Sequence, residues 1–262
     1  MIWCANWRLI LPMIRLIDAI PCAALDAFCA GDAFGTRIAA RAHSGGAYAD
    51  FWLQERNGEV TAALSRQDGV LELSAAKNAD SEELRQFLCA VDWQSLHCAD
   101  TARYIQEEPT QSGTVFRFVH SDAAGEMPGR LTTEDARAVY ALLAESGFAL
   151  PGSYGDWLAD IALRLRGGTA VLYGVRAGDG LCFTASILFQ TENAAFLGSI
   201  ATQKQARGQG IAAFALTALA RQLQAEGKRA ELFCAPALSV FYQKIGFQAC
   251  GTWSQYHKTD EV

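Results

Sequence analysis

The sequence lacks the features that mark several common classes of protein. Its eight cysteines include no C-x-x-C spacing, and its four histidines do not complete a ligand set around them, so no metal site is expected. No stretch approaches the ~18 apolar residues that a membrane-spanning helix needs. The formal net charge is −6 and the isoelectric point is near 5.3. This balance argues against nucleic acid or an anionic membrane as a main partner and mildly favours cationic substrates.

The N-terminal stretch has few marks of a targeting signal. Residues 1–12 are apolar, but they lack a basic leader, a sustained apolar run and a cleavage site of small residues. Met13-Ile14-Arg15-Leu16 is typical of an opening strand, which makes Met13 a candidate for the true start. Without a secretory signal, we expect reduced cysteines packed as small hydrophobic side chains, and a cytoplasmic location.

Length and composition indicate one large domain or two of ordinary size. The 262 residues are 51% hydrophobic and 19% charged, which is enough to form a full core. A polar segment with glycine and proline, 121–129, is the expected linker. We therefore expect one domain at 13–120 and a second at 130–262.

The first domain is expected to contain an antiparallel meander. Asn57-Gly58, the strongest short hairpin signal, joins two strand-like runs, and a second turn leads into a third. The expected strands are 51–56, 60–65 and 70–74, and the expected helices are 20–28 and 81–90. Ser81 is the expected cap of the second helix.

The second domain is expected to repeat this meander after two helices. Cap chemistry at 131–135 and a capping box at Ser153 and Asp156 mark the helix starts. The expected strands are 170–175, 181–189, 194–201, 230–234 and 247–253, with a helix at 210–226 and a short helix from about 238.

The two halves match each other at a nearly constant offset. Thr61-Ala62 corresponds to Thr184-Ala185 at an offset of 123, and Leu71–Ser74 corresponds to Ala195–Gly198 at an offset of 124. These matches indicate a degenerate internal duplication. The connection 75–80 contains no glycine, so the first copy is expected to lack a phosphate loop.

The most informative stretch is Gln205-Ala206-Arg207-Gly208-Gln209-Gly210-Ile211-Ala212, which lies between an apolar strand and a helix. The unpaired N–H groups and the dipole at a helix N-terminus attract an anion such as a pyrophosphate. Gly208 and Gly210 let the backbone approach phosphate oxygens, and Arg207 adds a cation. Two alternatives remain: a relaxed dinucleotide fingerprint, G-x-G-x-x-A, over 208–213, and a glycine-rich helix start that binds nothing.

A second motif, Phe241-Tyr242-Gln243-Lys244-Ile245-Gly246-Phe247, follows about thirty residues later. Together the motifs resemble the GNAT family of acyl-CoA-dependent N-acyltransferases, whose signature is a Q/R-x-x-G-x-G/A loop followed by (F/L)-Y-x-K-x-G-F. The matching residues are Gln205, Gly208 and Gly210, then Phe241, Tyr242, Lys244, Gly246 and Phe247. The resemblance is specific over 194–247. It implies an α/β (α+β) fold, a mixed and mostly antiparallel sheet flanked by helices, in two tandem copies.

Two observations favour this family over a dinucleotide-binding fold. The polar run 202–207 separates the strand from the first glycine, and the strands before it are joined by hairpins. The dinucleotide interpretation would use Glu231 as its acidic residue.

The resemblance implies an N-acetyltransferase that passes an acetyl (acyl) group from acetyl-CoA to a primary amine by direct attack. A backbone N–H of Ile200 or its neighbour would polarise the acetyl carbonyl. Tyr242 aligns with the tyrosine that in many members protonates the departing thiolate. The implied cofactor-binding residues are Ser199, Ile200, Ala201, Thr202, Gln205, Ala206, Arg207, Gly208, Gln209, Gly210, Ile211 and Ala212; no metal is implied. The expected acceptor is a small-molecule or protein amine, and the first half would shape its site or stabilise the second.

Two departures keep a non-catalytic alternative open, an acyl-CoA-binding or regulatory module. The family often has an asparagine seven residues before the tyrosine, where this chain has Ala235. No general base is evident. The candidates are Tyr154, Asp156, Asp160 and Glu192. Asp156 also fits a helix cap, and Tyr242 also fits a packing residue beside Phe241.

Overall fold

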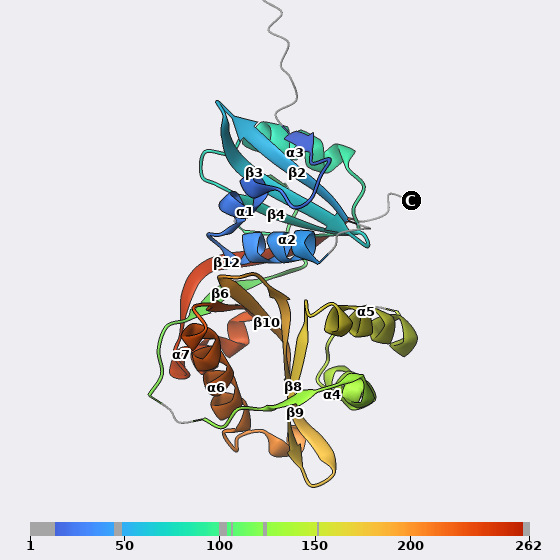
Figure 1. Ribbon diagram of the computed structural model, residues 1–262, viewed down its shortest axis with the longest axis vertical. Helices are drawn as coiled ribbons and strands as arrows, with labels where there is room; N and C mark the ends of the chain where they lie inside the picture. Colours follow the sequence, from blue (N-terminus) through green and yellow to red (C-terminus); the bar gives the residue numbers. More distant parts are fainter. Residues whose placement is uncertain are drawn as a thin grey trace, which may run out of the picture.

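The computed structural model describes residues 14–44, 49–99, 104–105, 107–122, 125–150 and 152–258. Their strands form one twelve-stranded sheet in the order β1-β2-β3-β4-β5-β12-β6-β11-β10-β9-β8-β7. Helices flank this sheet (Figure 1), which confirms the predicted fold class. The stretch 1–13, including Met13, lies outside the described residues.

The first half of the chain forms β1 (Ile14–Leu16), α1 (Ala23–Cys29), α2 (Ala33–His43), β2 (Ala49–Arg56), β3 (Glu59–Gln67), β4 (Val70–Ala75), α3 (Ser81–Ala90), β5 (Ser95–Cys98) and β6 (Gln111–Phe118). The second half forms β7 (Gly129–Leu131), η2 (Thr133–Asp135), α4 (Ala136–Glu145), α5 (Tyr154–Arg166), β8 (Val171–Ala177), β9 (Gly180–Gln190), β10 (Ala194–Thr202), η3 (Lys204–Ala206), α6 (Ile211–Ala225), β11 (Arg229–Cys234), η4 (Pro236–Leu238), α7 (Ser239–Lys244) and β12 (Phe247–His257).

Local sequence signals account for many of these boundaries. Asn57 and Gly58 both have positive φ, 52° and 83°, as a tight hairpin between β2 and β3 requires. Ser153 and Asp156 form the predicted reciprocal capping box at the start of α5. Four of the described strands and α-helices have no sequence prediction: α2, β5, β6 and β7.

The last strand of each half lies beside the other half. β6 belongs to the first half in sequence, but it lies between β11 and β12 and is antiparallel to both. β12 ends the second half and also pairs with β5, where Ser254 lies opposite Cys98. The exchange gives a partner to the edges of β5 and β11, which would otherwise be unpaired. The sheet therefore continues without a break through the waist of the molecule (Figure 1).

Strand registers confirm the internal duplication. In β4 and β5, Val70 lies opposite Ser95 in a parallel pairing. In β10 and β11, Ala194 lies opposite Arg229, again in parallel. Val70 and Ala194 are separated by the offset of 124 found in the sequence. All other pairings between the described strands are antiparallel.

Helices cover both faces of the second half (Figure 1). On one face, α6 and α7 pack on a cluster that contains the fully buried Phe116, Phe183 and Phe247. On the other face, α4 and α5 pack through Val139 and Trp157 against β8 and β9. The sheet of this half is therefore the middle of three layers.

α2 crosses the seam, the line along which the two halves of the sheet meet, and carries two buried arginines. Arg37 forms an ion pair with Glu72 of β4, and Arg41 lies 3.3 Å from the same carboxylate oxygen. His97 Nδ1 lies 3.0 Å from that oxygen. The Arg37 guanidinium also lies 4.8–5.1 Å from the centroids of three rings of the second half, Phe189, Phe196 and Phe233. The first half thus contacts β9, β10 and β11 through cation–π interactions.

Glu72 is fully buried in this network. Loss of solvation raises its pKa, but the fields of Arg37, His97 and Arg41 and the hydrogen bond with His97 outweigh that effect. The pKa therefore lies far below its ordinary value, and the carboxylate stays ionised at neutral pH. Among the described atoms, Oε2 of Glu72 and Nε of both arginines have no hydrogen-bond partner.

No helix in the described ranges is long and apolar enough to cross a membrane. Within the same residues, no group of three or more His, Cys, Asp or Glu side chains is arranged to hold a metal ion. None of the described cysteines forms a disulfide.

We expect Glu72→Gln to lower the free energy of unfolding by about 3 kcal/mol or more, because Arg37 and Arg41 would stay buried without a counter-charge. Urea unfolding at pH 7 measures this loss. Glu55→Gln, which removes the exposed partner of Arg15, is the control and should change stability by less than about 1 kcal/mol.

The same variant should change the response to acid. Below about pH 4.3, the ordinary pKa of glutamate, the unfolded chain takes up a proton that folded Glu72 does not bind. The wild-type protein therefore loses stability as the pH falls through this range, and Glu72→Gln should lack this component. Equal unfolding midpoints of the wild type and the variant between pH 7 and pH 3 would contradict the role of the network.

A fragment that begins at residue 121 should not fold stably, because it lacks β6 and leaves the edges of β11 and β12 without their partner. A fragment that begins at residue 107 retains β6 and is the matched control. Circular dichroism during urea unfolding should show a cooperative transition for the longer fragment only. An equally cooperative transition in both would mean that β6 is dispensable.

Candidate active site

β10 and β11 run side by side at their starts and then separate. Their parallel pairing covers Ala194–Leu197 with Arg229–Leu232 and stops there, although β10 continues along β9 to Thr202. From residue 198 on, the edge of β10 that faces β11 has no strand partner within the described sheet. The sheet therefore opens between the ends of these two strands, and unpaired backbone groups of β10 face this opening.

β10 is irregular at the same place. Its register with β9 shifts between Gly198 and Ala201, and Ser199 has a left-handed φ of 49°, which is uncommon for serine. A Cβ on Gly198 would lie 2.3 Å from Cδ1 of Leu188, so a side chain at this position would displace Leu188. A bulge of this kind breaks the ladder and re-aims the neighbouring backbone groups.

The strand leads through η3 into the predicted phosphate loop. Gly208 and Gly210 have left-handed φ values of 78° and 81°, and Gly210 is the N-cap residue of α6. No described side chain caps this helix, so the N–H groups of its first turn remain available to an anion. No atom lies within 4 Å of a Cβ built on Gly208, and Lys204 and Arg207 are exposed beside it.

The equivalent helix of the first half is closed to an anion. α3 follows β4 as α6 follows β10, but the Asp80 carboxylate accepts hydrogen bonds from the backbone N–H groups of Glu82 and Glu83, at 3.1 and 3.0 Å. The predicted cap, Ser81, is therefore wrong by one residue. A carboxylate at this place satisfies the donors and repels a phosphate. Of the two equivalent helices, only α6 has an open N-terminus.

Tyr242 lies on α7, in the hydrophobic cluster that also contains residues of the phosphate loop and of the first turn of α6. Three rings surround it, with centroids 5.1 to 6.0 Å away: Phe116, Phe241 and Phe247. Burial, and to a lesser extent the Cys234 thiol, raise the pKa of the phenol, which keeps its proton at neutral pH. A protonated phenol is a hydrogen-bond donor, and the dense packing also fits a core residue.

The acidic candidates for the general base either form hydrogen bonds or an ion pair with neighbouring side chains or lie far from the phosphate loop. Oδ2 of Asp156 accepts hydrogen bonds from the backbone N–H and the hydroxyl of Ser153, which lower its pKa. Asp160 pairs with Arg164, with 2.9 Å between Oδ1 and Nε. Glu192 lies in the turn before β10, on the order of 25 Å from the phosphate loop by the rise of a strand. None of the three carboxylates stands free beside the opening.

Tyr154, the remaining candidate, belongs to an aromatic group at the start of α5. Its ring centroid lies 5.2 Å from that of Tyr140 and 6.4 Å from that of Trp157. The Arg137 guanidinium covers the same ring, 4.5 Å from its centroid. These contacts indicate a packing role.

The sequence analysis did not predict that charged side chains within the strands would be buried and paired. Glu231 is fully buried on β11, and Oε1 accepts hydrogen bonds from Nε and Nη2 of Arg117 at 2.9 and 2.6 Å. A single carboxylate within an apolar run, 230–234, was the available signal. A dinucleotide-binding fold needs an accessible acid at a strand end and a mostly parallel sheet. The burial of Glu231 and the antiparallel pairings exclude that interpretation.

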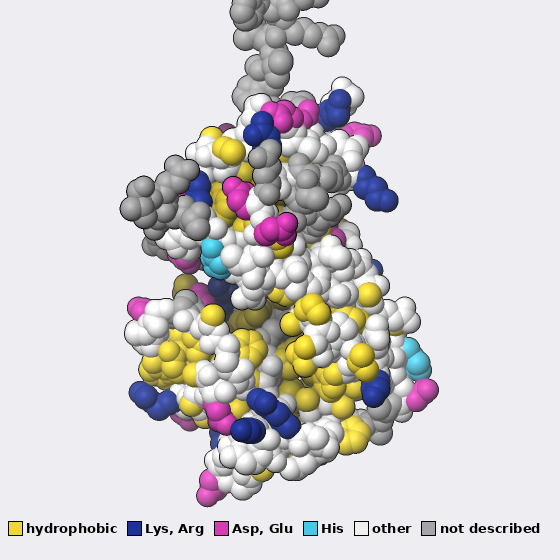
Figure 2. Space-filling model, turned by 180° about the vertical axis from the view of Figure 1, so that it is seen from behind, with side chains coloured by type: hydrophobic (Ala, Val, Ile, Leu, Met, Phe, Trp, Pro, Cys, Tyr) yellow, Lys and Arg dark blue, Asp and Glu magenta, His cyan; other side chains and the backbone are white. Residues whose placement is uncertain are grey.

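The back face of the molecule is hollowed in its lower half (Figure 2). Hydrophobic side chains gather on both sides of the hollow, and several Lys and Arg side chains lie below it. This surface suits a ligand with an apolar arm and an anionic end.

Sequence comparison identifies a family for the second half. A family model described as the acetyltransferase (GNAT) family matches residues 138–247, a range that contains Tyr242 and all the predicted cofactor-binding residues. No curated protein sequence matches the chain.

Solved structures extend the likeness to most of the chain. A GNAT-family acetyltransferase from Colwellia psychrerythraea has 15% identity and a TM-score of 0.56, with 94% of this chain and 99% of that chain covered. A GCN5-related N-acetyltransferase from Sphaerobacter thermophilus has 16% identity and a TM-score of 0.55, with 80% of each chain covered. A tandem GNAT protein from the clavulanic acid biosynthesis pathway has 14% identity and a TM-score of 0.53, with 92% and 97% covered. Residues 138–247 therefore belong to the acetyltransferase (GNAT) family, and the chain as a whole has the tandem form of its fold.

Proposed function

We propose that this protein is an N-acetyltransferase whose second half, residues 130–262, binds acetyl-CoA and transfers the acetyl group to a primary amine. One observation carries the proposal: β10 separates from β11 directly beside the uncapped N-terminus of α6. The family match contains both features. The proposed cofactor-binding residues are 199–202 and 205–212.

The anionic end of the cosubstrate is expected on the phosphate loop. The N–H groups of the first turn of α6 supply hydrogen bonds and the positive end of the helix dipole. Gly208 leaves its backbone open to the ligand, and Lys204 and Arg207 add two positive charges. The pantetheine arm contains amides, which suit the edge of β10 over residues 198–201, where no strand partner faces it.

The reaction joins the amine nitrogen to the acetyl carbon and breaks the carbon–sulfur bond. In the tetrahedral intermediate the carbonyl oxygen becomes negative, and a backbone N–H of Ile200 or its neighbour is expected to stabilise it. We assign to Tyr242 the proton that the departing thiolate accepts, since burial keeps the phenol protonated. The proton of the attacking amine is expected to leave through water, because Asp156 and Asp160 are engaged.

The first half is proposed to support the site rather than to bind a second cosubstrate. Its equivalent helix is capped by Asp80. Its α2 lies against β9 and β10, and Arg37 contacts the ring of Phe233 on β11. These contacts brace the two strands whose separation forms the opening.

Binding of an acyl-CoA without transfer is the second function that we consider. Ala235, in place of the asparagine often found in the family, and the engagement of both α5 carboxylates favour it.

We also infer a cytoplasmic location, because none of the described cysteines forms a disulfide.

Gly208→Asp should weaken acetyl-CoA binding at least about tenfold relative to Gly208→Asn. Both residues tolerate a left-handed φ, and space is open around this position, so both variants should fold. Only the aspartate places a negative charge beside the pyrophosphate. Calorimetric titration of acetyl-CoA measures both dissociation constants. Equal constants, or no binding to the wild-type protein, would refute the assignment of the loop.

Tyr242→Phe should slow acetyl transfer about 100-fold, the range expected for loss of a general acid. The dissociation constant of acetyl-CoA should change little, because the ring remains. The rate of CoA thiol release with a panel of primary amines reports the transfer.

Tyr173→Phe is the matched control for this experiment, because it removes a second buried phenol hydroxyl from the same hydrophobic cluster. Its turnover should equal that of the wild type. If Tyr242→Phe also retains full turnover, the phenol is a packing group. Acetyl-CoA binding to the wild type without turnover of any amine would support the non-catalytic function.

A further inference from the structure

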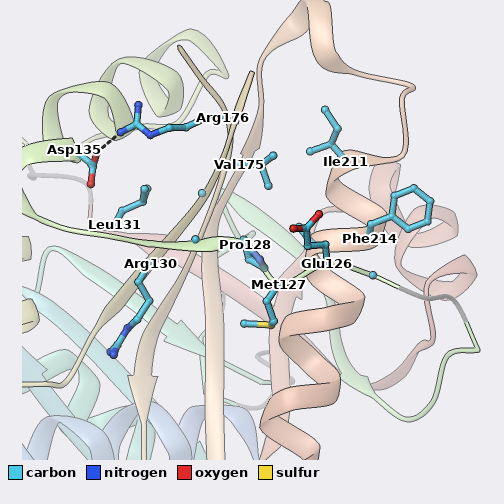
Figure 3. A pocket seen from close by; sticks show the side chains of 14 residues that line it. Glu126, Met127, Pro128, Arg130, Leu131, Asp135, Val175, Arg176, Ile211 and Phe214 are labelled. Carbon is cyan, nitrogen blue, oxygen red and sulfur yellow. Dashed lines mark hydrogen bonds and ion pairs between the residues drawn. The ribbon is translucent and has the colours of Figure 1, made fainter. Parts of the chain in front are cut away.

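A large cavity lies next to α6. Its volume is about 1040 Å³, which is at the upper end of the sizes of small-molecule sites, roughly 300–1,000 Å³. Its lining comes from the joining segment 125–131, from 174–176 of β8, and from the first turns of α6 with Ile211, Phe214 and Ala215; Asp135 of η2 also contributes. Figure 3 shows the joining segment crossing in front of the strands and passing beside α6.

This cavity is separate from the proposed acetyl-CoA site. Neither Tyr242 nor any of residues 198–210 lines it. The opening in the sheet lies between β10 and β11, whereas the cavity borders β7 and β8, two and more strands away in the sheet order. The two sites share only the first turn of α6.

The walls of the cavity are mainly apolar, and part of this surface is exposed. Phe214 is 49% exposed and Met127 is 37% exposed. Pro128, Leu131 and Val175 complete the apolar lining. A ligand with an apolar body would remove this surface from water.

The lining contains two carboxylates and two guanidinium groups, and one carboxylate has no ion-pair partner among the described residues. Asp135 and Arg176 form an ion pair with each other. The Arg130 guanidinium lies on the other side of the joining segment from the Glu126 carboxylate, which is turned toward the space near Val175 (Figure 3). Among the described residues, no hydrogen bond or ion pair engages Glu126. The cavity therefore presents, beside its apolar side chains, one exposed carboxylate that has no ion-pair partner among the described residues.

We propose that this cavity is a binding site for small organic amines in their cationic form, with an apolar alkyl or aryl body. The ammonium group pairs with Glu126, and the body packs against Met127, Val175 and Phe214. The site is distinct from the acceptor site of the transfer reaction.

The position of the cavity predicts a coupling that rests on the proposed function. A Cβ on Gly210 would lie 2.9 Å from the ring of Phe214, so this ring packs closely against the backbone of the phosphate loop at Gly210. An amine that orders Phe214 and Ile211 also orders the helix N-terminus that is proposed to hold the pyrophosphate. Amine and acetyl-CoA should each strengthen the binding of the other, by the same factor.

The test is calorimetric titration of the full-length protein with phenethylamine and hexylamine at pH 7, with 2-phenylethanol as the uncharged counterpart. Both amines should bind saturably, and the alcohol should bind at least about fivefold more weakly. Glu126→Gln should reduce amine binding to the level of the alcohol. Glu145→Gln, an exposed carboxylate on α4, is the control and should leave it unchanged.

A charge reversal makes the test sharper. Glu126→Lys should lose phenethylamine binding and gain binding of 3-phenylpropionate, which has a carboxylate in place of the ammonium group. The proposal is overturned if no amine binds, or if amine binding is insensitive to Glu126→Gln and Glu126→Lys, since the amine then occupies another site.

Titration of CoA, which binds the same loop but has no acetyl group to transfer to the amine, with and without saturating phenethylamine measures the coupling. A lower dissociation constant in the presence of the amine, absent in Glu126→Gln, is the expected result. If amines bind through Glu126 but acetyl-CoA does not bind at all, the proposed function fails and the amine site stands. If the amine binds through Glu126 but does not change the affinity for the cosubstrate, the amine site is supported and the proposed coupling is wrong.

Discussion

The exchange of the two last strands is the constraint on which the rest of the structure depends. A sheet edge without a partner exposes a row of backbone donors and acceptors. β5 and β11 would each leave such an edge, and each is covered by a strand from the other half, β12 beside β5 and β6 beside β11. β6 and β12 also pair with each other. The two copies therefore form one sheet, and the separation of β10 from β11 is held in place by residues of both.

The two copies differ at the positions that decide whether an anion can bind. In the first copy, the carboxylate of Asp80 occupies the helix N-terminus. In the second copy, Gly210 leaves the same place open. A related difference occurs at the middle of the sheet. Glu72 of β4 and Phe196 of β10 correspond at the offset of 124, and the Arg37 side chain contacts both. The first copy thus has a capped helix N-terminus and carries a buried charge network that faces the second copy.

The sequence was sufficient where the signals are local. Hairpins, the capping box at Ser153 and the glycine-rich loop are set by neighbouring residues, and two motifs in order indicated the family. The exchange of β6 and β12 was not predictable, because these strands pair across more than a hundred residues and carry no marker of their partners. α2 was missed because Arg37 and Arg41 count as polar in any periodicity, although both are buried. At the site, the loop followed from its motif, but the left-handed Ser199 and the separation of β10 from β11 arise from tertiary packing.

The absence of a free carboxylate on α5 among the described residues has a consequence for the choice of acceptor. An ammonium ion has no lone pair with which to attack a thioester, so transfer requires the neutral amine. With Asp156 in a helix cap and Asp160 in an ion pair, the proposed transfer would release this proton to water, and its rate would follow the neutral fraction of the amine. At pH values below the pKa of the amine, the neutral fraction increases about tenfold for each unit by which the pH is raised. A lysine side chain, with an ordinary pKa of about 10.4, is almost entirely charged at pH 7. We therefore expect the proposed reaction to favour amines of lower pKa over exposed lysines. A protein substrate would have to bring its own means of deprotonation.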